Sequence, residues 1–192
     1  SGMKFVYIKP QNTSNSGLQY GFYIGAAEVT HAQYKSVMGK TPDWFEGDEL
    51  PESGVSWNKA MEFCDKLSEK DGLRYSLPTV AQWKHACTAA GDAEYHCGRS
   101  IIDDFANFSP GSRNISTMPK KVCSYPANIR GIYDMHGNVA EWCRDKDGDL
   151  KRVLKGGSYR DGSEKLKVSF SESDSFQGNA KYYGFRVVVE VE

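Results

Sequence analysis

The distribution of hydrophobic periodicity along the chain limits what it can fold into. Apolar residues at helical spacing are confined to the first half, and this periodicity fades beyond about residue 92. The second half holds short apolar runs separated by polar turns, which predict strands: RGIYDMHG, RVLKGGSY, KLKVSFS and YGFRVVVEV. DKDGD at 145–149 predicts a hairpin turn between two of these runs, and Phe22 and Ile24 predict an earlier strand. Helices followed by strands are typical of an α+β fold, here with an unusually large share of loop.

Capping motifs place three helices in the first half. Thr30 with Gln33, and Thr79 with Gln82, have the spacing of a capping box, in which two side chains satisfy backbone donors at a helix start. Ser56 can cap a third helix. The apolar residues at helical spacing are Trp57, Ala60, Met61, Cys64, Leu67, Trp83, Ala86 and Cys87. The glycines that can end these helices are Gly39, Gly72 and Gly91.

Length and charge exclude some classes of partner. The chain has 192 residues, 39% of them apolar, and we expect one domain over residues 1–192. Its 24 basic and 25 acidic residues give a net charge of −1, which argues against nucleic acid as a partner. No apolar run approaches the roughly 20 residues of a membrane helix, so we expect no membrane insertion. Ser1 and Gly2 resemble a cloning remnant, which leaves the native start, a removed signal peptide and the compartment open.

Five cysteines occur without a Cys-x-x-Cys pair, which argues against a thioredoxin motif and a cysteine-rich zinc site. Cys64 and Cys87 lie in predicted helices and are expected to be buried thiols. Reduced, structural cysteines of a cytosolic type are the simplest interpretation. One disulfide among Cys97, Cys123 and Cys143 is left open.

Several segments, in order, resemble one known family. They are AAEVTHAQYKSVMG, GVSWNKAMEFCDKLSEKDGLRYSLPTVAQW, DMHGNVAEW, RVLKGGSY and a terminal GFRVV. Together they are similar to the formylglycine-generating enzymes, or sulfatase-modifying-factor domains, from about residue 18 to 189. The resemblance implies a C-type-lectin-like fold: two or three short helices packed on a small twisted antiparallel sheet, with long loops held by polar contacts.

The residues depart from this family where its catalysis takes place. The family's enzymes oxidise a substrate cysteine with two copper-binding cysteines just after Gly-Gly-Ser-Tyr, and soft thiolates are what select Cu(I). Here no cysteine follows Cys143, so we expect neither copper nor formylglycine generation, and no catalytic residue is assigned. A related branch uses non-haem iron held by clustered histidines. The four histidines here have no metal-binding spacing, so that activity is not expected either.

The resemblance also implies structural calcium. In Gly-Asn-Val-Ala-Glu-Trp, the ligands would be the Asn138 side chain, the Val139 carbonyl and the Glu141 carboxylate, which are the hard oxygens that Ca²⁺ prefers. The alternative is that Asn138 and Glu141 bond backbone amides and hold the same turn without metal. A second implied site begins at Asn107 and Phe108, but no acidic partner follows it closely in the sequence.

The C-terminal segment from Tyr159 to Tyr183 is rich in residues that are common in recognition surfaces. Tyr and Arg offer large contact area and adaptable hydrogen bonds at modest entropic cost. We take Tyr159, Arg160, Asp161 and Tyr182 as candidate ligand-binding residues. The alternative is that part of this set belongs to the core.

Three functions follow from these patterns. The first is a non-catalytic binding module that displays a surface for a protein or glycan. It includes the possibility of a retroelement-diversified variable protein, whose hypervariable segment lies between Gly-Gly-Ser and Gly-Phe-Arg; the dense Asn/Tyr runs of such segments are missing here. The second is a divergent enzyme of the same family. The third is an accessory or regulatory domain of a signalling or secretion system. The ligand and the oligomeric state are left open.

Overall fold

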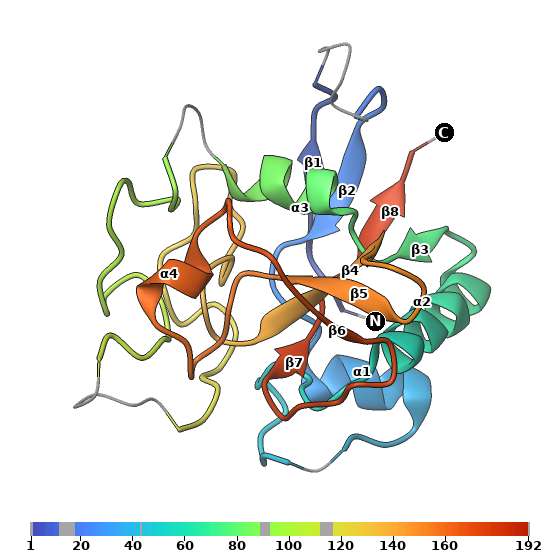
Figure 1. Ribbon diagram of the computed structural model, residues 1–192. Coiled ribbons are helices and arrows are strands. Elements are labelled where there is room, and N and C mark those ends of the chain that lie inside the picture. The colour runs from blue at the N-terminus through green and yellow to red at the C-terminus, as the bar shows by residue number, and fades with distance from the viewer. Residues whose placement is uncertain (1, 12–17, 43, 89–92, 112–116, 192) are drawn as a thin grey trace.

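The computed structural model describes residues 2–11, 18–42, 44–88, 93–111 and 117–191. Its helices in these ranges are α1 (His31–Met38), α2 (Trp57–Asp71), α3 (Val80–Cys87) and α4 (Ser163–Leu166). Its strands there are β1 (Phe5–Ile8), β2 (Phe22–Gly25), β3 (Tyr75–Ser76), β4 (Ala140–Lys146), β5 (Lys151–Lys155), β6 (Glu172–Ser175), β7 (Tyr183–Gly184) and β8 (Val188–Glu190). Figure 1 shows α2 on one side of the molecule, and α4 with the long loops before β4 on the other.

The strands form two four-stranded sheets. The first has the order β1-β2-β8-β3 and is antiparallel, whereas the second has the order β6-β5-β4-β7 and contains one parallel pair, β4 with β7. The α+β class is confirmed, but the single antiparallel sheet is replaced by two sheets. The segment 185–187 joins them, because the chain leaves β7 in the second sheet and enters β8 in the first. The prediction of a single domain over residues 1–192 stays a prediction.

The helices begin where their caps predict. In α1, Thr30 Oγ1 accepts from the Gln33 amide (3.3 Å) and Gln33 Oε1 accepts from the Thr30 amide (3.0 Å). The same reciprocal pair forms between Thr79 and Gln82 at the start of α3. Ser56 Oγ caps α2. Each cap satisfies backbone donors that a helix start leaves unpaired.

The helix ends are confirmed at two of three positions. Gly39 and Gly72 adopt left-handed conformations directly after α1 and α2. The third helix, α3, ends at Cys87 with Thr88 as its cap, so it stops before the predicted Gly91, which lies outside the described residues.

Two predicted strands are wrong. Residues 130–137 form a turn followed by irregular backbone, because the Asn128 side chain accepts hydrogen bonds from the amides of Arg130 and Ile132 and curls the start of the stretch. Residues 165–171 contain the end of α4 and a turn, because the buried Lys155 ammonium binds the carbonyls of that stretch. In both cases a distant or local polar side chain replaces the strand ladder as the partner of the backbone. The hairpin turn at 145–149 and the strands at β2, β5 and β8 are confirmed.

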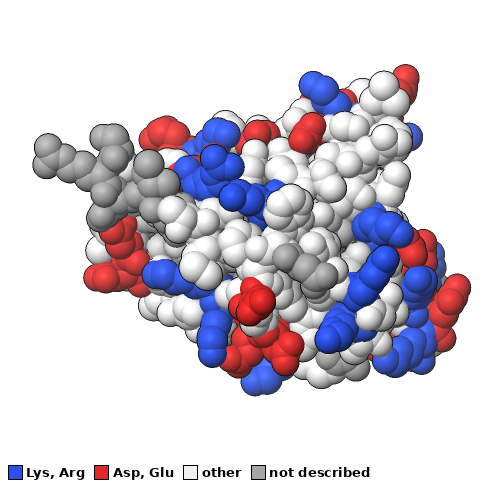
Figure 2. Space-filling view, turned by 90° about the horizontal axis from the view of Figure 1, so that it is seen from below, with Lys and Arg blue, Asp and Glu red and all other residues white. Residues whose placement is uncertain are grey.

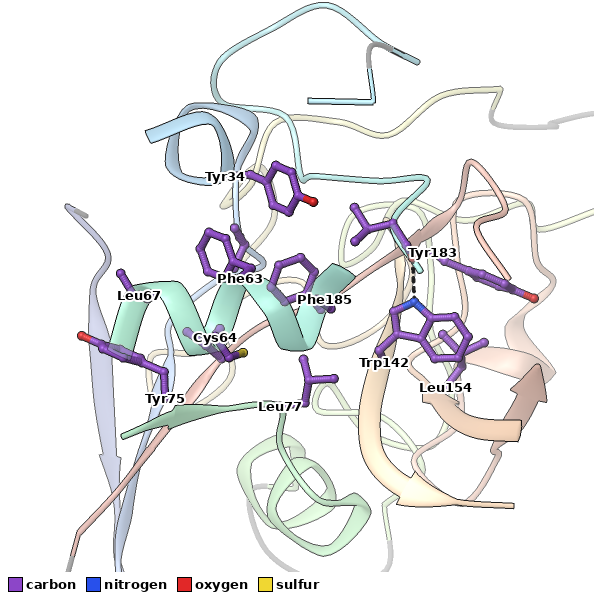
Figure 3. Packing of buried hydrophobic residues seen from close by; sticks show 14 of the residues in the cluster. Tyr34, Phe63, Cys64, Leu67, Tyr75, Leu77, Trp142, Leu154, Tyr183 and Phe185 are labelled. Atoms are coloured by element: carbon purple, nitrogen blue, oxygen red, sulfur yellow. Dashed lines mark hydrogen bonds between the residues drawn. The ribbon is translucent and has the colours of Figure 1, made fainter. Parts of the chain in front are cut away.

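Aromatic rings connect the helices with both sheets (Figure 3). Phe63 of α2 stacks on Tyr34 of α1, with centroids 5.5 Å apart, and meets Phe185 edge-on at 5.3 Å. Trp142 of β4 is fully buried, and its Nε1 donates to the Val55 carbonyl at 2.8 Å. A second cluster packs Trp83, Ala86 and Cys87 of α3 against the first sheet. Large aromatic areas buried in this way dominate the energy of a core.

The cysteines in this structure are free thiols, so the disulfide left open among Cys97, Cys123 and Cys143 is not formed. Cys64 and Cys87 are buried in α2 and α3, as predicted. None of the described helices is long and apolar enough to cross a bilayer.

Charged residues of both signs are mixed on the face seen in Figure 2, around an uncharged central area. This face therefore carries no broad field of one sign, in keeping with a net charge of −1.

Gly137 and Gly72 provide a matched test of backbone crowding. Both have positive φ (79° and 73°), but a Cβ at Gly137 would lie 2.3 Å from the Asn107 carbonyl oxygen, whereas a Cβ at Gly72 meets nothing within 4 Å. We expect Gly72→Ala to cost about 1 kcal/mol from backbone conformation alone, and Gly137→Ala roughly 2 kcal/mol more from the clash. Urea unfolding of both variants measures the difference. Equal losses would contradict the close approach of the two loops.

Candidate functional site

A buried ion pair lies at the centre of the Gly-Asn-Val-Ala-Glu-Trp region. Arg186, which follows β7 and has no exposed surface, donates from Nε and Nη2 to the two carboxylate oxygens of Glu141, at 2.7 and 2.6 Å. Its guanidinium also donates to the carbonyls of Gly25 (3.1 Å) and Tyr133 (3.0 Å). Burial alone would lower the pKa of Arg186, but the charge and hydrogen bonds of Glu141, together with the charges of Glu28 and Asp134, raise it. The guanidinium is therefore charged and fixed by bonds to several segments.

Glu141 does not fit a calcium ligand in this arrangement. Its carboxylate is 1% exposed and accepts from Arg186 at both oxygens and from Trp83 Nε1 at 2.8 Å. A guanidinium in direct contact already supplies the positive charge that a cation would bring. The alternative to calcium expected backbone amides as partners of Glu141, whereas its donors here are side chains of α3 and of the segment after β7.

Asn138 connects three segments through its side chain. It has a left-handed backbone (φ 60°), and its Oδ1 accepts from the Lys120 amide (2.9 Å) and from Asn107 Nδ2 (3.2 Å). Its Nδ2 donates to the Lys120 carbonyl (3.2 Å) and to Glu28 (3.3 Å), and Glu28 also accepts from the Val139 amide (3.4 Å). The side-chain oxygen predicted to bind calcium is thus already bonded within the protein.

The structure brings the two segments predicted to bind calcium side by side. The Asn107 carbonyl accepts from the Asn138 amide at 2.8 Å, and Asn107 also forms a bridge to Gly137. Phe108 is buried and packs in a small cluster with Leu166. In the described part of the chain, no group of three or more His, Cys, Asp or Glu residues is placed to hold a metal ion. Calcium binding stays a prediction.

Two acidic residues of this region are absent from the sequence prediction. Burial raises the pKa of Glu28 well above its usual value, with further increases from Asp134 and Glu141. Burial also raises the pKa of Asp134 to about 6. The charges of Glu28 and Asp134 act on the Arg186 guanidinium in addition to that of Glu141, and Glu28 also lines a mostly apolar cavity of about 550 Å³. Glu28 is 110 residues from Asn138, and no local pattern links the two.

His136 is a structural histidine. Its Nδ1 donates to the Leu166 carbonyl (2.7 Å), its Nε2 accepts from the His96 amide (3.0 Å), and the two imidazole rings stack with centroids 5.1 Å apart. Cys87 Sγ lies 3.5 Å from Nε2. Burial lowers the pKa of His136 to about 4, so the ring is neutral at physiological pH.

The four candidate ligand-binding residues have different environments. Arg160 is exposed, and its guanidinium lies 5.1 Å from the centre of the half-buried Tyr182 ring. Asp161 braces its own turn, because its Oδ2 accepts from the amide (3.0 Å) and the hydroxyl (2.6 Å) of Ser158. Tyr159 has no exposed surface and packs edge-on against Phe45. The structure thus brings Arg160 and Tyr182 together at the surface and leaves Tyr159 in the interior; binding by this set stays a prediction.

Comparison with known proteins finds a family match over nearly the whole chain. Residues 8–191 match the family described as "Sulfatase-modifying factor enzyme 1-like domain". "Chaperone protein LppX" of Paenibacillus barcinonensis is 28% identical over 222 residues, covering 87% of this chain and 79% of that protein. "Serine/threonine-protein kinase pkn1" of Chlamydia caviae is 31% identical over 156 residues, but the match spans 71% of this chain and 23% of the kinase. "Inactive C-alpha-formylglycine-generating enzyme 2" of Mus musculus is 28% identical over 135 residues, 59% of this chain and 39% of that protein.

Solved structures share the architecture at low sequence identity. "Treponema denticola variable protein 1" superposes with a TM-score of 0.84 at 22% identity, covering 98% of this chain and 95% of that chain. CarF superposes with a TM-score of 0.80 at 21% identity over 99% of both chains. PvdO from Pseudomonas aeruginosa gives 0.80 at 18% identity over 98% of this chain and 92% of that chain. The C-type-lectin-like fold implied by the sequence resemblance is confirmed.

Calcium binding can be tested by thermal unfolding with and without chelator. Because the side-chain oxygens of Asn138 and Glu141 already accept hydrogen bonds, we expect millimolar calcium to change the Tm by less than about 1 °C. A site with Kd tenfold below the calcium concentration would instead add about 1.4 kcal/mol, or roughly 3–6 °C. A rise of that size, lost in Asn138→Ala, would establish the calcium site predicted from the sequence.

The lowered pKa of the buried His136 predicts that the protein loses stability in acid. An unfolded histidine has a pKa near 6.5, and the folded value is about 4, so between these pH values the unfolded chain binds a proton that the folded chain does not. Stability therefore falls as pH falls through this window, by about 3 kcal/mol for this group. We expect His136→Gln to be less stable at pH 7 but to lose less on acidification. Asp134, whose pKa is raised, contributes the opposite slope in both proteins and cancels in the comparison. If the stability of the two proteins fell in parallel with pH, His136 would not be the group responsible for the loss.

Proposed function

The chain belongs to the family of sulfatase-modifying factor enzyme 1-like domains, and we propose that it is a non-catalytic member that binds a protein partner. The partner surface is centred on Arg160 and Tyr182, in the segment between Gly-Gly-Ser-Tyr and Gly-Phe-Arg. Loops on a rigid base are where proteins commonly place binding residues.

The observation that carries this proposal is the absence of thiols where the resemblance places the catalytic pair. Residues 157–186 contain no cysteine, and Asp161 there braces a turn. Elsewhere, burial raises the pKa of Cys64, Cys87 and Cys143, which disfavours the thiolates that bind copper. The residues present do not fit a copper centre, so we derive no redox step.

The relatives support a role in contact with other proteins. One is described as a chaperone, and the matched region makes up about a quarter of the Chlamydia kinase, alongside other sequence. One mouse relative is described as inactive, and another as a formylglycine-generating enzyme. The chaperone and kinase descriptions favour a protein over a glycan as the partner.

A second candidate is a diversified variable protein, which the superposition on the Treponema denticola variable protein favours. Arg160 and Tyr182 lie in the segment that such proteins vary. Deep sequencing of codons 157–186 from a clonal culture distinguishes the two candidates: variation confined to this window supports diversification, and a constant window supports a fixed partner.

Affinity capture tests the proposal directly. We expect the immobilised chain to retain a specific protein from cells that make it naturally, because a partner that packs on this surface buries both side chains. Arg160→Ala combined with Tyr182→Ala should reduce retention by about fivefold or more. Glu69→Ala combined with Lys70→Ala, at exposed positions in the last turn of α2, is the control and should leave it unchanged.

An activity assay tests the opposite possibility, that the chain is an enzyme. The purified chain is incubated with a cysteine-containing peptide, Cu(I) and oxygen, and aldehyde formation is followed by mass spectrometry. We expect no product. Turnover that depends on the chain would overturn the non-catalytic proposal.

A further inference from the structure

The guanidinium of Arg160 is uncommitted within the protein. Arg186 is bound by Glu141 and Arg144 by Glu190, both through charged pairs. Arg160 has a different environment: among the described residues its guanidinium contacts the Tyr182 ring, and the structure gives it no hydrogen bond or ion pair. Its planar fork of N–H donors is therefore free to bind an acceptor from outside.

The acid next to Arg160 does not neutralise it. Asp161 directs Oδ2 to Ser158 and Oδ1 to the Lys165 ammonium at 3.2 Å. Lys181, which precedes Tyr182, is exposed and has no ion pair among the described residues. The Arg160 guanidinium over the Tyr182 ring and the exposed Lys181, the residue before Tyr182, are thus left without a charged partner in this part of the structure.

The Arg160 guanidinium lies over the Tyr182 ring, with its central carbon 5.1 Å from the ring centre. A guanidinium stacked on an aromatic face keeps its donor edge available, and this edge matches the two oxygens of a carboxylate. Below the surface, the hydroxyl of the buried Tyr159 has no hydrogen-bond partner among the described residues. Arg160 and Tyr182 are close enough to affect the pKa of Tyr159, with Arg160 lowering it against the larger effect of burial. The Tyr159 hydroxyl therefore does not engage the guanidinium, whose N–H donors all remain available in the described part of the chain.

We propose, resting on the protein-binding function above, that Arg160, Tyr182 and Lys181 bind an acidic segment of the partner protein. A carboxylate of that segment pairs with the Arg160 fork, and a further acidic residue approaches Lys181. An acidic polypeptide is favoured over a single small anion because Arg160 and Lys181 come from separate parts of the segment and present charge at two points.

The test is an NMR titration of the isotopically labelled full chain at low salt. The probes are a blocked tetraglutamate peptide, its tetraglutamine counterpart, inorganic phosphate and a uronic-acid disaccharide. We expect tetraglutamate to shift the amides of residues 159–162 and 180–183, with tetraglutamine inactive and binding weakened by added salt. Arg160→Gln should raise the Kd about fivefold, and Lys181→Gln about twofold. Lys70→Gln, the same substitution on exposed α2 surface, is the matched control and should leave it unchanged.

Several outcomes would overturn the inference. No localised shifts, or an unchanged Kd in Arg160→Gln, would remove Arg160 from the site. Equal binding of phosphate would show a general anion site, and tighter binding of the disaccharide would assign the carboxylate to a glycan. If affinity capture succeeds and Arg160→Gln retains the partner fully, the partner function stands and the acidic-segment assignment fails. If tetraglutamate binds at Arg160 but no partner is captured, the site for acidic residues stands and the proposed partner function fails.

Discussion

The pairing of Arg186 with Glu141 is the contact on which both sheets depend. Arg186 follows the last strand of the second sheet and precedes β8 of the first, while Glu141 belongs to β4. Through the Gly25 carbonyl the same guanidinium holds the end of β2. Removing one partner of such a pair leaves a buried charge, at a cost of about 3–5 kcal/mol, whereas replacing both by apolar groups can be neutral. The pair therefore fixes how the sheets meet more than it adds to net stability.

Polar side chains give order to a molecule with little regular structure. Asn128 donates to the carbonyls of Ala86 and Cys87 at the end of α3 and accepts from the turn at 130–132. The Asn138 side chain likewise donates to the Lys120 carbonyl and accepts from the Lys120 amide and the Asn107 side chain. Buried backbone groups must find partners, and here amide side chains supply those that strand ladders supply elsewhere. The described parts of the long loops are thus held in place by specific polar contacts.

What could be predicted from the sequence was local. Capping boxes at Thr30 and Thr79 and the hairpin at 145–149 depend on residues within a few positions of each other, so their spacing was sufficient. The segments at 130–137 and 165–171 have strand-like patterns but are shaped by contacts outside those patterns. The apolar stripe predicted for α2 omits Phe63, which is fully buried in that helix.

The site was harder to predict for the same reason. The donors to Glu141 come from 58 and 45 residues away, and no local spacing identifies them. Tyr159 has an amphipathic side chain, which is found both in binding surfaces and in cores, so the sequence could not show that it lies in the core.

The position of β8 has a consequence for the order in which the chain folds. It inserts between β2 and β3, and Arg186 reaches Gly25 across 161 residues of sequence. The first sheet therefore cannot close during synthesis until nearly the whole described chain has left the ribosome. Until then β2 exposes an unpaired edge next to apolar residues that later form the core. Because the contacts that complete the first sheet are long-range, we expect folding to be slower than for helical proteins of similar length.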